Sequence, residues 1–273
     1  MSIKFRGHLS GCLPGLPRPG SAACVALVLW LGGYSHNLQA QLLEQDTARW
    51  QLAVGHNLFY SEGNVDRLLN RSDASIKYLA AKWGAASESQ YLFGTFGPRV
   101  TENDVLSKHF VYLWPRARWY PYAMVWTEAT FRRRVDQRYL LGLGLSWVAI
   151  RAKQYHLKLS ATAGWEQAQY GRPRLVNLDD QTDHLQEPRA VARLYGWVQL
   201  PKLLKLTYEA WYQHAWVHAS NKRLFAQASL QVPVHPSISL RATTQYSYDQ
   251  IHVQGTEDAD LYLTFGLQWA FSD

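Results

Sequence analysis

The clearest pattern along the chain is a strict alternation of large apolar and polar residues, and it is most regular over 259–271. The apolar positions of this segment are Leu261, Leu263, Phe265, Leu267, Trp269 and Phe271, and each is separated from the next by one smaller or polar residue. Successive side chains of a strand point to opposite faces, so the segment predicts a β-strand with one apolar and one polar face.

Twelve segments carry this kind of pattern, with Gly, Pro, Asn and Asp at the breaks between them. The alternation is weakest in the third and fourth segments, which are apolar on both faces. An even number of such segments is typical of a closed antiparallel barrel. The predicted strands lie at 48–60, 71–83, 88–97, 106–114, 119–131, 136–150, 154–168, 189–200, 203–216, 222–232, 237–249 and 259–271.

The breaks between the segments fall into two length classes. After the even-numbered segments they are short, at 84–87, 115–118, 151–153, 201–202 and 233–236. After the odd-numbered segments they are mostly longer, at 61–70, 98–105, 171–188, 217–221 and 250–258, with 132–135 as the exception. Short turns at one end and long loops at the other are typical of an outer-membrane barrel whose two termini are periplasmic.

Aromatic residues gather at both ends of the predicted strands, as the interface belts of a membrane barrel require. On the short-turn side they are Trp50, Trp83, Trp114, Tyr120, Trp147, Tyr155 and Trp269. On the opposite side they are Trp165, Tyr170, Trp216, Tyr246 and Tyr248. A soluble β-sandwich leaves these belts and the two loop classes unexplained. The pattern therefore predicts an all-β fold: a transmembrane antiparallel up-and-down β-barrel of about 12 strands.

The start of the chain predicts an export signal over 1–40, because basic residues precede the apolar run 22–31. The barrel is then expected over 41–273. Cys12 and Cys24 are the two cysteines of the chain and both lie in the predicted signal. A thiol nucleophile, a disulfide framework and a cysteine metal site are therefore excluded from the predicted barrel.

Composition is compatible with a barrel and gives no indication of nucleic-acid binding. Hydrophobic residues make up 47% of the 273 residues, yet the predicted barrel lacks the run of about 18 apolar residues that a helical span needs. The chain has 28 Lys+Arg and 21 Asp+Glu, and removing the three basic residues of the signal leaves 25 against 21. An excess of four positive charges does not predict a nucleic-acid partner.

The fifth and sixth segments together carry a specific motif: an aromatic strand with an inward Glu, a turn with Asp-x-Arg, and a Gly-x-Gly strand. Its residues here are Glu128, Asp136, Arg138, Gly142 and Gly144. The motif resembles the central motif of the YdiY-like, salt-induced outer-membrane protein family, and the resemblance covers most of 50–271. It implies location and fold only, because that family has no assigned activity. We expect the two glycines to make room for a large neighbour such as Trp126 or Trp211.

If the apolar faces contact lipid, the polar faces line the barrel interior. The resulting candidates are Glu128, Arg138, Lys158, Glu166, Arg193, Lys205, Glu209 and Arg241. Two interpretations stay open: an ion-paired core that fills the barrel, and a selective pore lining. We favour the filled core, because buried charges are normally paired. Bulky residues predicted to point inward narrow the interior further, namely Tyr195, Trp197, Trp211 and Phe225.

The only dense basic run is Arg132, Arg133 and Arg134, at the outer end of the fifth segment. Lipid phosphates would attract it, although a solvated turn is an equal alternative. The expected partners are outer-membrane lipid and lipopolysaccharide. The Phe near the end of the last segment also predicts recognition by the barrel-assembly machinery of a Gram-negative bacterium.

No pattern in the chain requires catalysis, a cofactor or a metal. His218 and Ser220 have no acidic residue beside them in sequence, and Asp249 with His252 is a loose pair. The acidic residues near Asp183 lack the spacing of a calcium loop. The sequence predicts a non-enzymatic outer-membrane barrel of the envelope-stress type, structural or a narrow passive channel. The alternatives are an outer-membrane hydrolase using rim His and Asp residues, and a soluble periplasmic binding protein.

Overall fold

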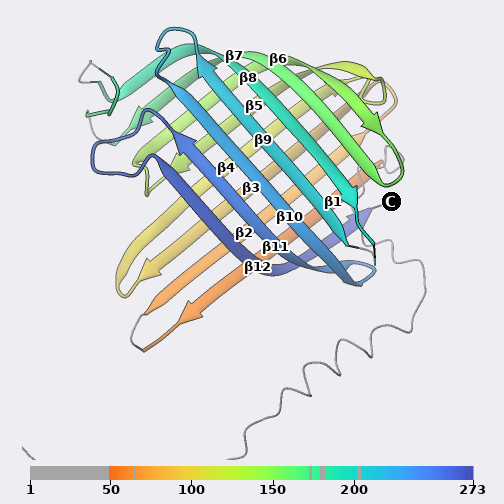
Figure 1. Cartoon of the computed structure of the whole chain (residues 1–273), viewed down its shortest axis with the longest axis horizontal. Coiled ribbons are helices and arrows are strands. Elements are labelled where there is room, and N and C mark those ends of the chain that lie inside the picture. The colour runs from red at the N-terminus through yellow and green to blue at the C-terminus, as the bar shows by residue number, and fades with distance from the viewer. Residues whose placement is uncertain (1–48, 64–65, 172–173, 179–181, 202–203, 273) are drawn as a thin grey trace, which may run out of the picture. The chain divides into compact units, whose positions relative to one another are not determined.

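The computed structural model describes residues 49–63, 66–171, 174–178, 182–201 and 204–272, so the predicted export signal lies outside it. Figure 1 shows the strands of the barrel, joined by turns and loops. They are β1 (Trp50–Ser61), β2 (Arg67–Leu79), β3 (Trp83–Phe96), β4 (Arg99–Leu113), β5 (Trp119–Thr130), β6 (Val135–Arg151), β7 (Tyr155–Tyr170), β8 (His184–Gln199), β9 (Lys205–Ala215), β10 (Lys222–His235), β11 (Ile238–Asp249) and β12 (Ala259–Ser272).

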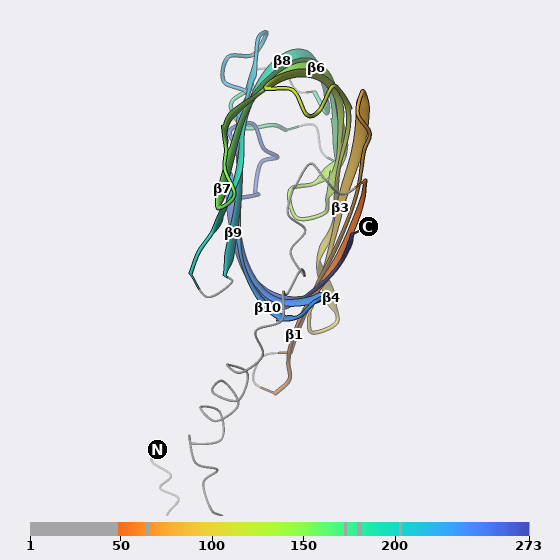
Figure 2. The same cartoon turned by 90° about the vertical axis from the view of Figure 1, so that its right-hand side faces the viewer.

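The sheet closes on itself, because β1 pairs antiparallel with β12 as well as with β2. Each of the strands β2 to β11 pairs with the strand before it and the strand after it in the chain, which is an up-and-down topology. Figure 2 shows the closed ring of strands. The prediction of a 12-stranded antiparallel barrel is confirmed. The described part of the chain contains no helix that is long and apolar enough to cross a membrane.

The outer surface of the barrel is apolar. Along β6, Leu140 points inward and is 1% exposed, whereas Leu143 points outward and is 72% exposed. Leu263 and Phe265 of β12 are also exposed on the outer face. Large apolar side chains that are exposed in this way indicate a surface covered by lipid or by another apolar partner.

Aromatic side chains mark both ends of this apolar surface. Trp50, Trp83 and Tyr155 are exposed at one end, and the rings of Trp119 and Trp147 stack there with centroids 5.5 Å apart. Exposed Trp165 and Trp216 lie toward the opposite end. Their arrangement fits the interface belts of a membrane barrel.

Two aromatic residues that were expected in the belts lie inside the barrel instead. Tyr120 is 4% exposed, because the preceding Trp119 takes the outward position of the alternating strand. Tyr170 is buried as well, and its hydroxyl accepts a hydrogen bond from Arg138 Nη2 at 3.3 Å.

The strands at the start of the barrel differ most from the prediction. β2 begins and ends four residues earlier than the predicted 71–83. β4 begins at Arg99, so the long loop predicted at 98–105 is wrong: the chain turns at Gly97, whose φ of 55° is readily adopted by glycine. The polar residues of 102–104 resemble a loop in sequence, but they pair with β3 in the sheet.

The difference in loop length between the two ends is therefore confined to the second half of the chain. We call the end that holds 171–183, 216–221 and 250–258 the long-loop end. The other is the short-turn end, with turns at 80–82, 114–118, 152–154, 200–204 and 236–237.

Candidate functional site in the barrel interior

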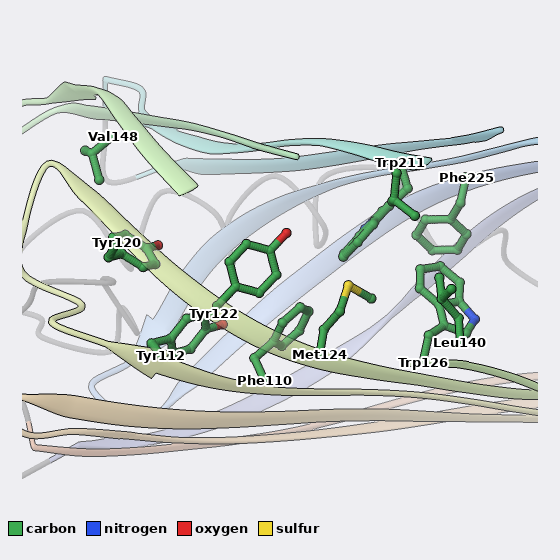
Figure 3. Packing of buried hydrophobic residues seen from close by; sticks show 11 residues of the cluster. Phe110, Tyr112, Tyr120, Tyr122, Met124, Trp126, Leu140, Val148, Trp211 and Phe225 are labelled. Atoms are coloured by element: carbon green, nitrogen blue, oxygen red, sulfur yellow. The ribbon is translucent and has the colours of Figure 1, made fainter. Parts of the chain in front are cut away.

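A cluster of apolar and aromatic side chains lies inside the barrel, as Figure 3 shows. Its buried members are Phe110, Tyr112, Tyr120, Tyr122, Met124, Trp126, Leu140, Val148, Val191, Trp211 and Phe225. Strands β4 and β5 supply most of them, because alternate residues of both strands are aromatic or apolar. The ring of Trp211 in β9 lies 6.1 Å from Phe110 and 5.3 Å from Trp126, between centroids. β4 and β9 are five places apart in the closed order, so these contacts cross the lumen.

The two motif glycines of β6 make room for this cluster. A Cβ atom on Gly144 would lie 2.7 Å from Cζ of Tyr122, and one on Gly142 would lie 2.5 Å from Cγ2 of Thr162. The expected neighbours, Trp126 and Trp211, are therefore replaced by Tyr122 and Thr162. The hydroxyl groups of these two residues share a hydrogen bond of 2.6 Å.

A buried ion-pair group lies in the same layer as the rings. Lys108 Nζ is 2.5 Å from Glu209 Oε2, and Arg193 Nη2 is 2.5 Å from Glu209 Oε1. The guanidinium of Arg193 lies 4.6 Å from the ring centroid of Trp211 and 4.8 Å from that of Phe110. We call these residues, together with Trp126 and Phe225, the central layer. It joins β4 and β5 to β8, β9 and β10 across the lumen.

A larger ion-pair network, the rim network, lies toward the long-loop end. One half is centred on Arg138, whose Nη1 is 3.2 Å from both Glu128 Oε2 and Asp249 Oδ2. Arg133 Nη1 also contacts Asp249 at 3.1 Å, and Arg133 Nε contacts Asp260 at 2.7 Å. Arg138 is 1% exposed, so its charge depends on these carboxylates for compensation.

The other half of the rim network is centred on two buried glutamates. Glu166 pairs with Arg189 at 2.8 Å and also with Arg223. Glu187 accepts hydrogen bonds from Asn221 Nδ2 and from the backbone N–H of His218. The network therefore joins β7, β8 and β10 to the loop 216–221.

The two longest described loops pack together at the long-loop end. Leu175 and Val253 form an isolated β-bridge between 171–183 and 250–258. Both lie in a second buried apolar cluster with Tyr170, Leu185 and Ile251. The contacts hold the loops against the ends of the strands.

Two cavities lie on either side of the central layer. The larger, of about 230 Å³, is lined by residues toward the short-turn end, including Gln51 and Lys77. The smaller, of about 60 Å³, is lined by rim residues that include Glu128 and Asp249. Gln90, Leu106 and Phe225 line both cavities, so these side chains separate them.

The structure places all eight predicted interior residues on the inner face. Glu128 and Arg138 contact each other, as do Arg193 and Glu209. Two others have partners that the sequence did not predict: Glu166 contacts Arg189 and Arg223, and Arg241 contacts Asp73. The Nζ atoms of Lys158 and Lys205 lie 4.7 Å from the ring of Tyr195 and 5.4 Å from that of Trp197, respectively.

The basic run at 132–134 departs from its expected role. Arg132 pairs with Asp104 at 2.9 Å and with Asp260 at 2.5 Å, and Arg133 pairs with acids of β11 and β12. Their guanidinium groups are thus held in internal ion pairs rather than presented to lipid phosphates. The reason is that the turn after β5 brings them over inward-facing carboxylates at the barrel mouth. For Arg134, lipid contact stays a prediction.

Several charged residues of the interior ion-pair networks were not predicted from the sequence. Lys108 was detectable, because it stands two positions before Phe110 on the inward face of β4. Glu187 was not, because it fell in the break predicted at 171–188, whereas β8 begins at His184. Arg189 was detectable, because it begins the predicted strand 189–200 on the same face as Arg193. Arg223 follows the start of a correctly predicted strand, but its partner is on β7.

His218 has no acidic residue beside it in sequence, but the fold brings Glu187 of β8 to it. His218 Nδ1 lies 3.1 Å from Glu187 Oε2. Ser220 Oγ, however, donates its hydrogen bond to the backbone carbonyl of Asn177 at 3.2 Å rather than to the histidine. Together these contacts fasten the loop to the barrel, and they do not assemble an activated serine.

No metal-binding cluster of three or more His, Cys, Asp or Glu side chains occurs within the described ranges. At the start of β8, His184 Nδ1 lies 2.6 Å from Asp183 Oδ1 of the preceding loop. The hydrogen bond from His184 lowers the pKa of the Asp183 carboxyl. Because both side chains are about half exposed, the contact contributes little to stability.

Comparisons with known proteins agree with the barrel. A family model described as "Protein of unknown function, DUF481" matches residues 34–271. Similar solved structures include the NanC porin, with a TM-score of 0.50 and 13% identity over 80% of this chain and 98% of that one. An outer membrane channel from Pseudomonas putida F1 has a TM-score of 0.44 and 11% identity, over 88% and 100%. A search of curated proteins gave no match. The similarity to NanC is one of fold.

Proposed function

Because this chain belongs to the DUF481 family of proteins of unknown function and has the fold of outer-membrane porins, we propose that it is an outer-membrane barrel with a closed interior. It serves the Gram-negative envelope as a structural barrel of the envelope-stress type rather than as an open diffusion pore. The observation that carries this proposal is the central layer, in which side chains from opposite walls of the barrel contact each other.

The central layer supports a closed interior on physical grounds. An open porin lumen is water-filled, and its charged side chains are hydrated. Here Lys108 and Arg193 are buried among aromatic rings and share Glu209, and Lys108 also contacts Glu88 at 3.2 Å. Opening this layer would separate ion pairs and expose buried rings, which is unfavourable.

A role under salt stress is supported by the burial of these ion pairs. Salt screens exposed charge pairs strongly and buried pairs much less. The ion pairs of the central layer and of the Arg138 group are buried, so the interior should keep its contacts at ionic strengths that weaken surface pairs.

A narrow passive channel is the second candidate, and the two cavities favour it. Only three side chains, Gln90, Leu106 and Phe225, line both of them. A shift of these side chains would join the cavities without dismantling the rim network. The two candidates differ in whether the wild-type protein conducts ions.

Location and orientation can be tested with single cysteines in a variant that lacks Cys12 and Cys24. Gln254→Cys lies in an exposed loop at the long-loop end, and Lys82→Cys lies in an exposed turn at the short-turn end. We expect a membrane-impermeant maleimide to label Gln254→Cys on intact cells. Lys82→Cys should be labelled only after the outer membrane is permeabilised.

Both variants should also fractionate with outer membranes, and the cysteine-free parent serves as the control for background labelling. Recovery of the protein in the soluble periplasm would contradict the membrane barrel. Labelling of Lys82→Cys alone on intact cells would place both termini on the outside.

A further inference from the structure

Arg71 is a buried arginine on the inner face of β2 that makes no direct ion pair, and Asp73 attracts its charge only at longer range. It is 3% exposed. Its Nη2 donates to Gln90 Oε1 at 2.9 Å and to Gln227 Oε1 at 3.1 Å, on the neighbouring strand and on the far wall. Its Nε is buried and has no hydrogen-bond partner. A guanidinium carries five N–H donors, so most of its capacity is unused.

No carboxylate within the described residues lies at ion-pair distance from Arg71. The acid two positions along the strand is Asp73, but Arg241 contacts both of its carboxylate oxygens. By contrast, Arg138 and Arg193 are each paired with acids. A buried cation without an anion is costly, so Arg71 needs another explanation.

The cavity beside Arg71 offers an explanation for its unused hydrogen-bond donors. Arg71 lines the cavity of about 230 Å³ on the short-turn side of the central layer. Six basic side chains line this cavity against three acidic ones, Asp73, Glu88 and Glu209, an excess of three positive charges. A water molecule occupies about 30 Å³ in the liquid, so the cavity exceeds the volume of several waters. It is smaller than the roughly 300–1,000 Å³ of a drug-sized pocket.

We propose that Arg71 anchors a binding site for a small free anion that carries a carboxylate or phosphate group and enters from the short-turn end. The planar guanidinium presents paired donors that match either oxyanion. Gln90 and Gln227 hold Arg71 in place by accepting its Nη2 hydrogen bonds. The ligand is a solute rather than a lipid headgroup, because the site lies inside the barrel and away from its apolar outer face.

The anion site adds a ligand to the proposed closed barrel. It rests on the proposed function in one respect, because the central layer must close the cavity toward the long-loop end. The barrel would then hold an anion without passing it through. The closed layer is tested by conductance and the anion site by equilibrium binding, so one can fail without the other.

The test uses the full barrel in non-ionic detergent, with inorganic phosphate as the probe and chloride at matched ionic strength as the reference. We expect phosphate to raise the melting temperature of the wild-type protein relative to chloride. Arg71→Gln should abolish this increase and weaken phosphate binding, followed by ³¹P NMR line broadening, by about tenfold or more.

The matched control is Arg67→Gln, since Arg67 is on the same face of the same strand but is paired with Glu102 at 2.9 Å. Its phosphate response should equal that of the wild type. If Arg71→Gln does not fold, Arg71→Lys keeps the charge without the paired donors and should show a reduced response. If phosphate raised the melting temperature equally in the wild type, the Arg71 variants and Arg67→Gln, the effect would be a general salt effect and would overturn the site. The absence of any phosphate response in the wild type would overturn it as well.

Discussion

Replacing Glu209 with glutamine should lower the free energy of unfolding of the barrel by about 3–5 kcal/mol, the usual cost of removing one partner of a buried ion pair. Glu209 contacts both Lys108 and Arg193, and all three side chains are buried; Lys108 has Glu88 as a second acidic partner. Glutamine has nearly the same shape, so the loss reflects charge rather than volume. Urea unfolding in detergent, followed by tryptophan fluorescence, measures the change.

A second substitution tests the cause of this loss. Adding Arg193→Met to Glu209→Gln removes the cation that has lost its contacting carboxylate, whereas Lys108 keeps Glu88 at 3.2 Å. The double variant should therefore lose less stability than the sum of the two single losses. Glu257→Gln, in the exposed loop 250–258, is the control and should change stability by less than about 0.5 kcal/mol. A loss below about 1 kcal/mol for Glu209→Gln would mean that the layer is hydrated, as in a pore.

Replacing Arg138 with methionine should cost a similar amount, about 3–5 kcal/mol. Arg138 lies at the centre of the rim network and contacts both Glu128 and Asp249. Without it Glu128 loses its ion-pair partner among the described residues, whereas Asp249 keeps Arg133. The same urea unfolding measurement applies, with Arg99→Met at an exposed strand end as the control.

The double-mutant cycle with Glu128→Gln identifies the origin of this cost. Because glutamine removes the uncompensated charge, the double variant should cost distinctly less than the two single variants added together. A coupling near zero, together with altered ion selectivity of the variants, would indicate a water-filled interior and would refute the filled barrel.

The fold was predictable because one physical pattern repeats along the chain. Alternation with period two shows both the strand and its lipid-facing side, and it is clearest in β7, β9, β11 and β12. The alternation failed to predict a strand where polar residues occupy both faces. The residues 102–104 are polar on both faces and were assigned to a loop, although they pair with β3.

Contacts between interior side chains were predictable only where the two residues lie on neighbouring strands. Glu128 and Arg138 are paired in register across β5 and β6, so their contact followed from the hairpin. Lys108 and Glu209 are 101 positions apart and meet across the lumen. That contact depends on how the barrel closes, which alternation within single strands does not specify. The turn of Arg132 and Arg133 toward internal acids was missed for the same reason.

The most direct test of the closed interior is single-channel conductance of the purified wild-type protein in a planar lipid bilayer. The comparison is the double variant Leu106→Ala with Phe225→Ala, which truncates two of the side chains that line both cavities. Leu263→Ala with Phe265→Ala, on the lipid-facing side, is the matched control. With a closed interior, the wild type and the control should show no conductance steps, and the interior variant should show measurable steps. Stable steps from the wild-type protein, of the same size as those of the interior variant, would contradict it.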